Sequence, residues 1–359
     1  MLTENVLKKS FSGRSIVKKI GIHNRSGSFS DRWVEYCRQK NIPYKTVDCH
    51  SSDIIRELAD CSFLMWNWSQ TYAEDMLIAR GLIKAVELMG IQVFPSFETC
   101  WHFDDKIAQK YLMEALGVPM VKSYVFLGRD KALEWARKTE YPKVFKLRGG
   151  AGSSNVSLVN DINKAEKLIN KAFSTGFPPV SRWNALSERW WQFRRDKTFV
   201  SFFNISRGIF RALIKNPTLK RLPVQRNYAY FQDFVPDNDF DIRVIVIGKR
   251  AFGIKRMVRE GDFRASGSGK ILYDPKLIPE ACIRMTFDLA EKTGSQSLAL
   301  DFVFSDGVPL VVEMSYAFAS YGYLPCPGYW KSDMTWVEGS FYPQDFMVDD
   351  LITSSVEKN

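Results

Sequence analysis

The sequence of 359 residues lacks several patterns that mark common protein classes. No uninterrupted run of about 18 apolar residues occurs, so a membrane-spanning helix is not expected. The N-terminal stretch MLTENVLKKSFSGRSIVKKIGI has no apolar segment of the signal-peptide kind. We therefore expect a cytoplasmic globular protein with two or three domains, at the usual size of about 100 to 200 residues each.

Cysteine and histidine are scarce and are not spaced as metal ligands. The six cysteines form no C-x-x-C pair, which favours reduced core residues over disulfides or a zinc site. His23, His50 and His102 have no i, i+4 partner, so core or surface roles are expected for them rather than catalysis. No convincing serine-histidine or cysteine nucleophile is present, which favours chemistry without a covalent protein intermediate.

Positive charge is concentrated in one stretch. The formal net charge is +10, and residues 182–226 hold eleven Lys/Arg against Glu188 and Asp196. Because the rest of the chain is close to neutral, a local basic surface explains the excess better than a general affinity for nucleic acid, which is not expected as a partner.

Aromatic residues are interleaved with these arginines. The aromatic side chains are Trp183, Trp190, Trp191, Phe193, Phe199, Phe202, Phe203 and Phe210. This composition is typical of a cationic surface element that contacts anionic membranes, and it predicts peripheral contact with the inner face of the membrane through residues 182–226. The alternative is a helical insertion whose aromatics pack on the protein and whose arginines are solvated.

The remaining pattern predicts an α/β part followed by an α+β part. From about residue 15, apolar strand-like stretches alternate with helical ones, which favours a parallel sheet of roughly 100 residues. We expect one helix with its N-cap at Ser30 and another that ends at Gly117. After the basic stretch, antiparallel strands with one helix indicate an α+β domain.

The stretch YPKVFKLRGGAGSSNVSLV, residues 141 to 159, places Lys146 on a strand before a glycine- and serine-rich turn. It fits neither the P-loop, whose lysine follows the glycines, nor the G-x-G-x-x-G fingerprint. Bare backbone amides and a lysine both approach anions closely, so a flap over phosphate is one interpretation. An ordinary loose hairpin is the other.

Two acidic residues occur in neighbouring apolar strands, Asp301 in LALDFVF and Glu313 in LVVEMS. Carboxylates that face each other across adjacent strands need a cation between them, and magnesium is the natural candidate. The alternative is that both face solvent on the polar side of the sheet. Asp241 and Arg243 occur on an earlier strand, with Arg256 and Arg264 on or around the next one, and this arginine cluster would suit phosphate charge.

Six stretches in a fixed order resemble the ATP-grasp carboxylate-amine ligases, and within them the branch of the ribosomal-protein glutamate ligase. They are DKIAQKYLMEALGVP at 105–119, KLRGGAG at 146–152, QDFV at 232–235, DIR at 241–243, EGDFR at 260–264, and the pair Asp301 and Glu313 with Ser315. The resemblance covers about residues 100 to 318. It implies an ATP-grasp fold in which an N-terminal parallel α/β pre-grasp domain precedes two α+β subdomains that enclose ATP.

The resemblance also implies roles for individual residues. The residues implied to bind ATP are Lys106, Lys146, Gly149, Gly150, Gly152, Ser153, Ser154, Asp233, Phe234, Asp241 and Arg264. Arg243, Arg256 and Arg264 are the implied catalytic residues, and Asp301, Glu313 and Ser315 fall at the positions that bind Mg²⁺, with two ions expected. The branch usually has asparagine where Ser315 stands, and a serine hydroxyl is a shorter and weaker ligand.

The activity that the resemblance implies is ATP-driven formation of an acyl phosphate, followed by attack of an amine to give an amide. The aromatic tail beyond Ser315, with Tyr321, Tyr323, Tyr329, Trp330 and Trp336, could offer platforms for sugar rings or could wrap onto the core. We therefore expect a small-molecule or saccharide carboxylate and an amino-acid amine as substrates, in surface-polysaccharide synthesis. The alternatives are a non-catalytic ATP-binding protein with a degenerate metal site and a kinase on the same fold.

The predicted boundaries follow from these assignments. The pre-grasp domain is expected at 1–103, the lid subdomain at 104–175, the basic aromatic insertion at 176–228 and the C-terminal subdomain with the metal site and the aromatic tail at 229–359.

Overall fold

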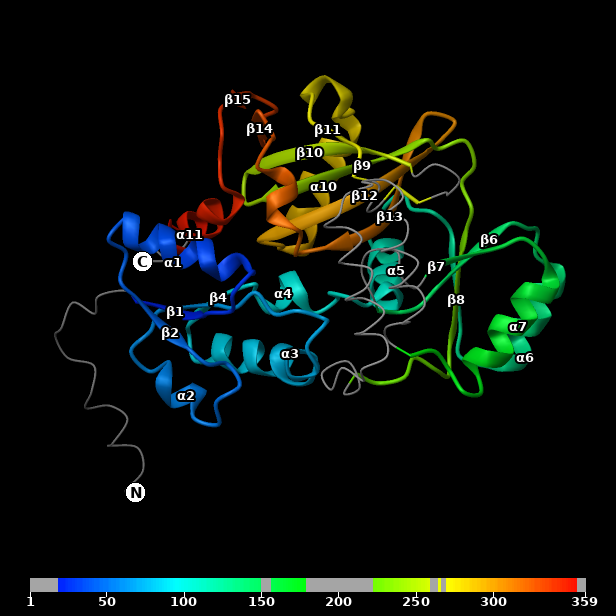
Figure 1. Ribbon diagram of the computed structural model, residues 1–359, viewed down its shortest axis with the longest axis horizontal. Helices are drawn as coiled ribbons and strands as arrows, with labels where there is room; N and C mark the ends of the chain where they lie inside the picture. Colours follow the sequence, from blue (N-terminus) through cyan, green and yellow to red (C-terminus); the bar gives the residue numbers. More distant parts are fainter. Residues whose placement is uncertain (1–18, 150–155, 179–221, 259–263, 266–268, 354–359) are drawn as a thin grey trace, which may run out of the picture.

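The computed structural model describes residues 19–149, 156–178, 222–258, 264–265 and 269–353, which form three β-sheets with flanking helices (Figure 1). One sheet is parallel and two are antiparallel, so the predicted α/β plus α+β class is confirmed. Most of the basic stretch and the tip of the glycine-rich flap lie outside the described residues.

The N-terminal sheet is parallel, with the strand order β2-β1-β3-β4. Its strands are β1 (Ile20–His23), β2 (Tyr44–Val47), β3 (Phe63–Met65) and β4 (Gln92–Phe94). Its helices are α1 (Phe29–Gln39), α2 (Ile54–Glu57), α3 (Ala73–Leu88) and α4 (Phe97–Cys100). Helices α1 and α3 lie on opposite faces of the sheet (Figure 1), as the alternation of strands and helices predicts.

Helix α1 begins earlier than the sequence predicted. Its N-cap is Ser28, whose hydroxyl accepts the Ser30 N–H, so the expected N-cap at Ser30 is wrong. Ser30 is fully buried, and its Oγ accepts the Arg25 N–H and lies 3.0 Å from Asn24 Oδ1. Ser30 therefore fixes the loop after β1, whereas Ser28 satisfies the orphan amides of the helix.

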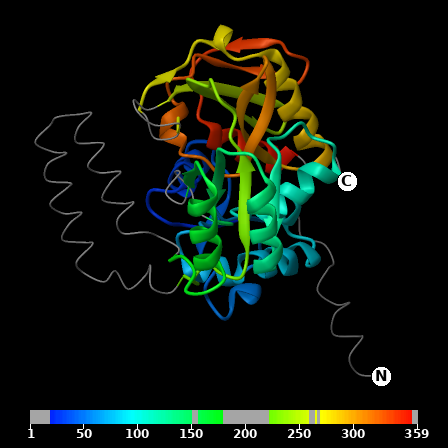
Figure 2. The same cartoon turned by 90° about the vertical axis from the view of Figure 1, so that its right-hand side faces the viewer.

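The small antiparallel sheet has the strand order β5-β8-β6-β7. Its strands are β5 (Ser123–Phe126), β6 (Lys143–Lys146), β7 (Val156–Val159) and β8 (Ala229–Asp233), and its helices are α6 (Arg129–Lys138) and α7 (Ile162–Ala172). Leu133, Phe145, Ile169 and Phe231 share one buried core between helices and sheet. This unit lies at the end of the molecule opposite the N-terminal sheet (Figures 1 and 2).

The large antiparallel sheet has the order β13-β12-β9-β10-β14-β15, with β11 paired to β10. Its strands are β9 (Phe240–Ile247), β10 (Arg250–Met257), β11 (Ile271–Leu272), β12 (Ser297–Ser305), β13 (Val308–Ser315), β14 (Gly328–Lys331) and β15 (Trp336–Glu338). Its helical elements are α5 (Lys106–Ala115), α10 (Glu280–Thr293), α11 (Pro343–Thr353) and two short 3₁₀ turns, η2 (Pro275–Leu277) and η3 (Ser320–Tyr323).

Two of the predicted domain boundaries do not follow the sheets. Helix α5 was assigned to the lid subdomain, yet its Met113 packs in the core of the large sheet, and Val121 donates its N–H to Val311 of β13. Strand β8 was assigned to the C-terminal subdomain, yet it pairs with β5 and β6. Helix α5 therefore belongs with the large sheet, and β8 completes the small one. As predicted, Gly117 follows α5 with a positive φ of 64°.

The aromatic tail packs between the N-terminal sheet and the large sheet. Tyr323 is buried in a core that also contains Trp33 of α1 and Met347 of α11. The Arg32 guanidinium makes two hydrogen bonds of 2.7 Å to the Asp345 carboxylate, which joins α1 to α11. The packing alternative for the tail is thus the one observed for Tyr323, while Tyr321 is exposed.

Within the described ranges, no helix combines the length and the apolar character needed to cross a bilayer. All six cysteines are buried free thiols, as predicted.

Candidate active site

A cavity of about 500 Å³ lies between the small and the large sheet. This volume is typical of small-molecule sites, which span about 300 to 1,000 Å³. The cavity lining brings together Lys106, Lys146, Asp233, Phe234, Asp241, Arg243, Arg264, Asp301, Glu313 and Ser315. These residues are spread over about two hundred positions of sequence, and the folded chain brings them together at one cavity.

The other predicted residues lie beside the cavity or outside the description. Arg256 is buried next to the lining residues and contacts two of their carboxylates. Gly149 ends the described part of the flap, and Gly150, Gly152, Ser153 and Ser154 lie outside the described residues.

The face of the large sheet at the cavity carries a network of paired charges. Asp241 and Arg243 are two positions apart on β9 and therefore point to the same face. The strand register sets Arg256 of β10 opposite Asp241, and Asp301 of β12 opposite Arg243. Arg256 binds the Asp241 carboxylate through two hydrogen bonds of 2.6 Å, and Arg243 binds the Asp301 carboxylate through two of 2.5 Å.

Asp301 lies at the centre of this network. A third contact, 3.0 Å long, joins its Oδ1 to the Arg256 guanidinium. Burial alone would raise the pKa of Asp301, but Arg243 and Arg256 outweigh burial and hold this pKa well below its usual range. Two arginines and two aspartates balance in charge, so this face is internally neutralised.

Glu313 and Lys106 form the next pair. Glu313 of β13 lies directly opposite Asp301 in the strand register, and its Oε1 is 2.9 Å from Lys106 Nζ. Lys106 is the first residue of α5, where Asp105 caps the helix. Burial lowers the pKa of Lys106, but the Glu313 and Asp104 carboxylates outweigh it, and the net effect is a raised pKa.

The predicted metal ligands fit a magnesium ion in donor type. Asp301 and Glu313 present carboxylate oxygens to the same cavity from adjacent strands, and hard oxygen donors are what Mg²⁺ prefers. Ser315 also lines the cavity, but its hydroxyl donates to the Ala317 carbonyl at 2.7 Å and accepts the Ala317 N–H at 3.1 Å. By donor type the two carboxylates match Mg²⁺ better than the serine hydroxyl does, and both are already paired with cations, Asp301 with Arg243 and Glu313 with Lys106.

Lys146 lies on the opposite, small-sheet side and has a different environment. Its Nζ donates to the neutral Gln232 Oε1 at 2.5 Å, and both side chains are buried. Burial lowers the pKa of Lys146 to about 8, and the nearby Lys106 acts in the same direction, whereas Glu313 and Asp301 oppose it. An anion placed in the cavity would favour the charged form of this lysine.

Gly149 allows a close approach of the flap to the start of α5. A side chain at Gly149 would place its Cβ 2.6 Å from Asp104 Oδ2, so a larger residue requires a local shift. The Arg148 carbonyl also accepts the Lys106 N–H at 2.9 Å. Glycine at position 149 therefore allows the flap to pack closely against Asp104, in addition to any contact with an anion.

Part of the cavity wall is apolar. Val144, Phe234, Val258 and Phe240 contribute to its wall. Asp233 stands among them and binds Lys143, with 2.7 Å between Oδ1 and Nζ. This combination of apolar surface with a polar edge suits a flat heteroaromatic ring.

A second pocket of about 270 Å³ opens beside the first and shares three lining residues with it, Gln70, Phe103 and Ala317. It lies between the loops that follow β1 and β3, next to the N-terminus of α1. In the order β2-β1-β3-β4 this is where the chain switches direction across the sheet, the usual place for ligands in open parallel sheets.

The contact of Gln232 with Lys146 was not predicted, because Gln232 was considered only as part of the QDFV motif. The alternation in YFQDF could have found it, because Phe231 faces the core while Tyr230 and Gln232 face the other side of β8. His23 and His50, for which core or surface roles were expected, lie together near Asp48 at the edge of the N-terminal sheet.

Comparison with solved structures decides the fold. A structure described as a RimK domain ATP-grasp protein from Sphaerobacter thermophilus superposes with a TM-score of 0.53 at 14% identity, over 93% of this chain and 99% of that one. D-alanine–D-alanine ligase from Bacillus anthracis gives 0.57 at 13% identity, over 95% and 98%. This chain has the ATP-grasp fold. The biotin carboxylase domain of the Hydrogenobacter thermophilus 2-oxoglutarate carboxylase, solved with MgADP, shares it at 0.57 and 13% identity, over 94% and 70%.

The sequence comparisons are narrower than the structural ones. No family model matches the chain. A curated relative, phosphoribosylamine–glycine ligase from Fusobacterium nucleatum, is 25% identical over 168 residues, which is 46% of this chain. The match spans 37% of that ligase, well under two thirds of its length. The ATP-grasp fold of this chain is therefore established by structural similarity, whereas sequence similarity does not establish its activity.

Proposed function

We propose that this protein is an ATP-dependent, ADP-forming ligase that joins a carboxylate to an amine. The observation that carries the proposal is the meeting of Lys106, Lys146 and Arg264 with Asp301 and Glu313 around one cavity of an ATP-grasp fold. Cations that suit phosphate oxygens and carboxylates that suit magnesium are the two requirements of phosphoryl transfer. The ligases among the solved structures of this fold support the same class of reaction.

Each group has a role that follows from its position. The apolar part of the wall would hold adenine, and Lys146 and Arg264 would contact the phosphates. We propose that the glycine-rich segment after Gly149, which lies outside the described residues, also contacts them. Asp301 and Glu313 would hold magnesium, with Ser315 contributing to a second ion, and the metal supplies charge neutralisation of the phosphates. Lys106 lies beside Glu313 and would stabilise the charge of the transferring phosphoryl group.

The proposed reaction has two steps. A substrate carboxylate oxygen attacks the γ-phosphorus, ADP leaves, and an acyl phosphate forms. An amine then attacks the acyl carbon, the C–O bond to phosphate breaks, and the amine loses a proton as the amide forms. Arg243 and Arg256 hold Asp301 and Asp241 in the structure, so we assign to them the orientation of these carboxylates, with contact to the acyl phosphate through the edge of Arg243 that lines the cavity.

The second pocket is the proposed entry for the substrates. It joins the ATP cavity at Phe103 and Ala317, and its own wall contains Arg25, Ser26 and Ser69. This polar wall suits a hydroxyl-rich small molecule, and we propose a saccharide carboxylate joined to an amino-acid amine in the synthesis of a surface polysaccharide. We also propose a cytoplasmic location with peripheral contact to anionic lipid through residues 182–226, which lie largely outside the described residues.

The direct experiment offers the protein magnesium, ATP and a pool of uronic acids and amino acids, with ADP and amide products measured by mass spectrometry. Lys146→Met should abolish product, whereas Lys138→Met, on the exposed surface of α6, should not. An amide product from Lys146→Met at the wild-type rate would contradict the assignment. Sedimentation with anionic liposomes tests the lipid contact separately, and a protein that stays in the supernatant would remove that part of the proposal.

A non-catalytic ATP-binding protein is the second candidate, because Asp301 is already held by two arginines and Ser315 by a backbone turn. The same experiment separates the candidates. A binder takes up ATP and releases no ADP with any substrate, a kinase releases ADP and a phosphorylated product, and a ligase releases ADP together with an amide.

A further inference from the structure

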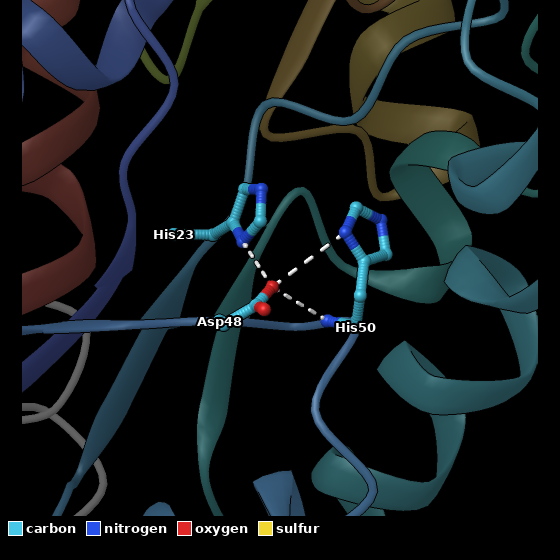
Figure 3. A group of neighbouring side chains, drawn as sticks. All are labelled: His23, Asp48 and His50. Carbon is cyan, nitrogen blue, oxygen red and sulfur yellow. Dashed lines mark hydrogen bonds and ion pairs between the residues drawn. The ribbon is translucent and has the colours of Figure 1, made fainter. Parts of the chain in front are cut away.

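A second cluster of chemically capable side chains lies at the carboxyl edge of the N-terminal sheet. His23 is the last residue of β1, and Asp48 follows directly after β2. Because β1 and β2 are parallel neighbours, these ends meet, and His50 comes from the same loop as Asp48. Figure 3 shows both imidazole rings and the Asp48 carboxylate pointing toward one another.

The three ligand atoms are close enough to share one ion. One nitrogen or oxygen from each of His23, Asp48 and His50 lies within 4.8 Å of the other two. The Asp48 Oδ1 is 3.8 Å from His23 Nδ1 and 3.5 Å from His50 Nδ1. Ligands about 2.0 to 2.2 Å from a tetrahedral zinc ion are separated by roughly 3.3 to 3.6 Å, so the two Asp48 distances need only a small contraction.

A buried carboxylate, Asp75, orients the His50 ring as carboxylates do behind the histidine ligands of metal sites. His50 Nε2 lies 2.8 Å from Oδ1 of Asp75, which is fully buried, while the other Asp75 oxygen accepts from Arg25 at 2.7 Å and from the Ser69 N–H. With Nε2–H donated to Asp75, the lone pair of His50 is on Nδ1 and faces Asp48. A carboxylate behind a histidine in this way is the common second layer of zinc sites.

His23 is also in the form that a metal requires. Its Nδ1 accepts the Cys49 N–H at 3.0 Å, which places a lone pair on that nitrogen. An ion must displace the Cys49 hydrogen bond, so we expect an exchangeable site rather than a permanent structural one.

We propose that His23, Asp48 and His50 bind a first-row divalent metal ion of the zinc type. Two imidazole nitrogens and one carboxylate oxygen are the donors that such ions prefer over magnesium, and the exposure of Asp48 and His50 leaves a position open to water. None of the three residues lines the ATP cavity, so this site stands or falls independently of the proposed ligase activity.

The test measures zinc bound to the full-length protein in the absence of nucleotide, by calorimetry and by metal analysis after dialysis. The wild type should bind one Zn²⁺ per chain at this site. His50→Gln and Asp48→Asn should each lose it, and Asp75→Asn should weaken binding by about 10- to 100-fold, the usual effect of removing an outer partner. Asp53→Asn, an exposed change on the same loop, should bind as the wild type does.

Two controls make the result decisive. Glu313→Gln should keep the zinc site, because its carboxylate belongs to the ATP cavity. Thermal unfolding in chelator should show that Asp48→Asn remains folded, since its side chain is 66% exposed. Equal zinc binding by the wild type, His50→Gln and Asp48→Asn, whether all bind or none does, would overturn the proposal.

Discussion

On the large-sheet side of the cavity, Arg243 and Arg256 contact the carboxylates of Asp241 and Asp301, whereas on the small-sheet side Lys146 contacts the neutral amide oxygen of Gln232. The first set of charges is balanced within the protein. The second has a buried cation whose pKa is lowered because burial is not offset by a directly bound carboxylate. The charges of the large sheet are therefore already paired within the protein, and we propose that Lys146 pairs with an incoming anion.

The largest loss of stability is expected from breaking the charge network of the large sheet. Asp301→Asn removes the charge that two buried arginines share, which should cost about 3 to 5 kcal/mol in the free energy of unfolding. Urea denaturation of the wild type and the variant measures this loss. Asp306→Asn in the exposed β12–β13 turn is the control, with an expected change below about 0.5 kcal/mol. If Asp301→Asn also changed the free energy of unfolding by less than about 0.5 kcal/mol, the charge network would not stabilise the folded protein.

The pH dependence of Lys146 gives the next largest effect. Its pKa of about 8 in the folded protein lies below the ordinary 10.5, so the unfolded chain binds more protons between these values, and its contribution to stability rises with pH across this window. At about 1.4 kcal/mol per pKa unit, the charged lysine costs about 3 kcal/mol at pH 7. Lys146→Met should therefore be more stable than the wild type at pH 7, and the difference should shrink toward pH 10.5.

The comparison is made by urea denaturation at several pH values, with Lys138→Met as the exposed control. A stability difference between Lys146→Met and the wild type that does not vary with pH would mean that the pKa of Lys146 is not lowered in the folded protein.

A smaller effect is expected at Lys106, which lies between the two regions. Glu313→Gln leaves this buried ammonium without the carboxylate that offsets burial, so the pKa of Lys106 should fall and stability should decrease by about 2 kcal/mol at pH 7. Thermal unfolding gives the loss. A Glu313→Gln protein with wild-type stability would show that Glu313 does not neutralise Lys106.

The smallest effect is expected at Ser315. Ser315→Ala removes the hydroxyl proposed for the second metal and should raise the magnesium concentration for half-maximal ATP binding by about 5- to 10-fold, which corresponds to about 1 kcal/mol. Titration of magnesium at fixed ATP measures this. Ser305→Ala, away from the cavity lining, should leave the value unchanged. An unchanged value for Ser315→Ala as well would remove Ser315 from the metal site.

The strands and the pairing of Asp301 with Glu313 could be predicted from local periodicity, whereas Lys106, Asp233 and Ser315 were assigned only through the resemblance to the ATP-grasp ligases. The apolar runs around Asp301 and Glu313, joined by the Ser305 to Gly307 turn, form the expected hairpin with the two carboxylates in register. Period-two alternation likewise sets Asp241 and Arg243 on one face.

The features that the sequence did not give depend on contacts between distant segments. Strand β8 pairs with β6 across the basic stretch, so nothing local indicated that it belongs to the small sheet or that Gln232 would meet Lys146. His23 meets His50 only through the parallel register of β1 and β2. The ion pairs of Arg243 with Asp301 and of Arg256 with Asp241 were also not predicted. The sequence shows that these charges are near one another, but it does not show which of them pair.

The central proposal is that the phosphates of ATP pair with the Lys146 ammonium. It is tested most directly by calorimetric titration of MgATP at pH 7 to 9.5 in buffers of different ionisation enthalpy. The wild type should bind more weakly as pH rises through about 8 and should take up as much as one proton per ATP above that value. Lys146→Met should bind much more weakly and take up correspondingly less. Equal affinity and equal proton uptake in the two proteins would contradict the account.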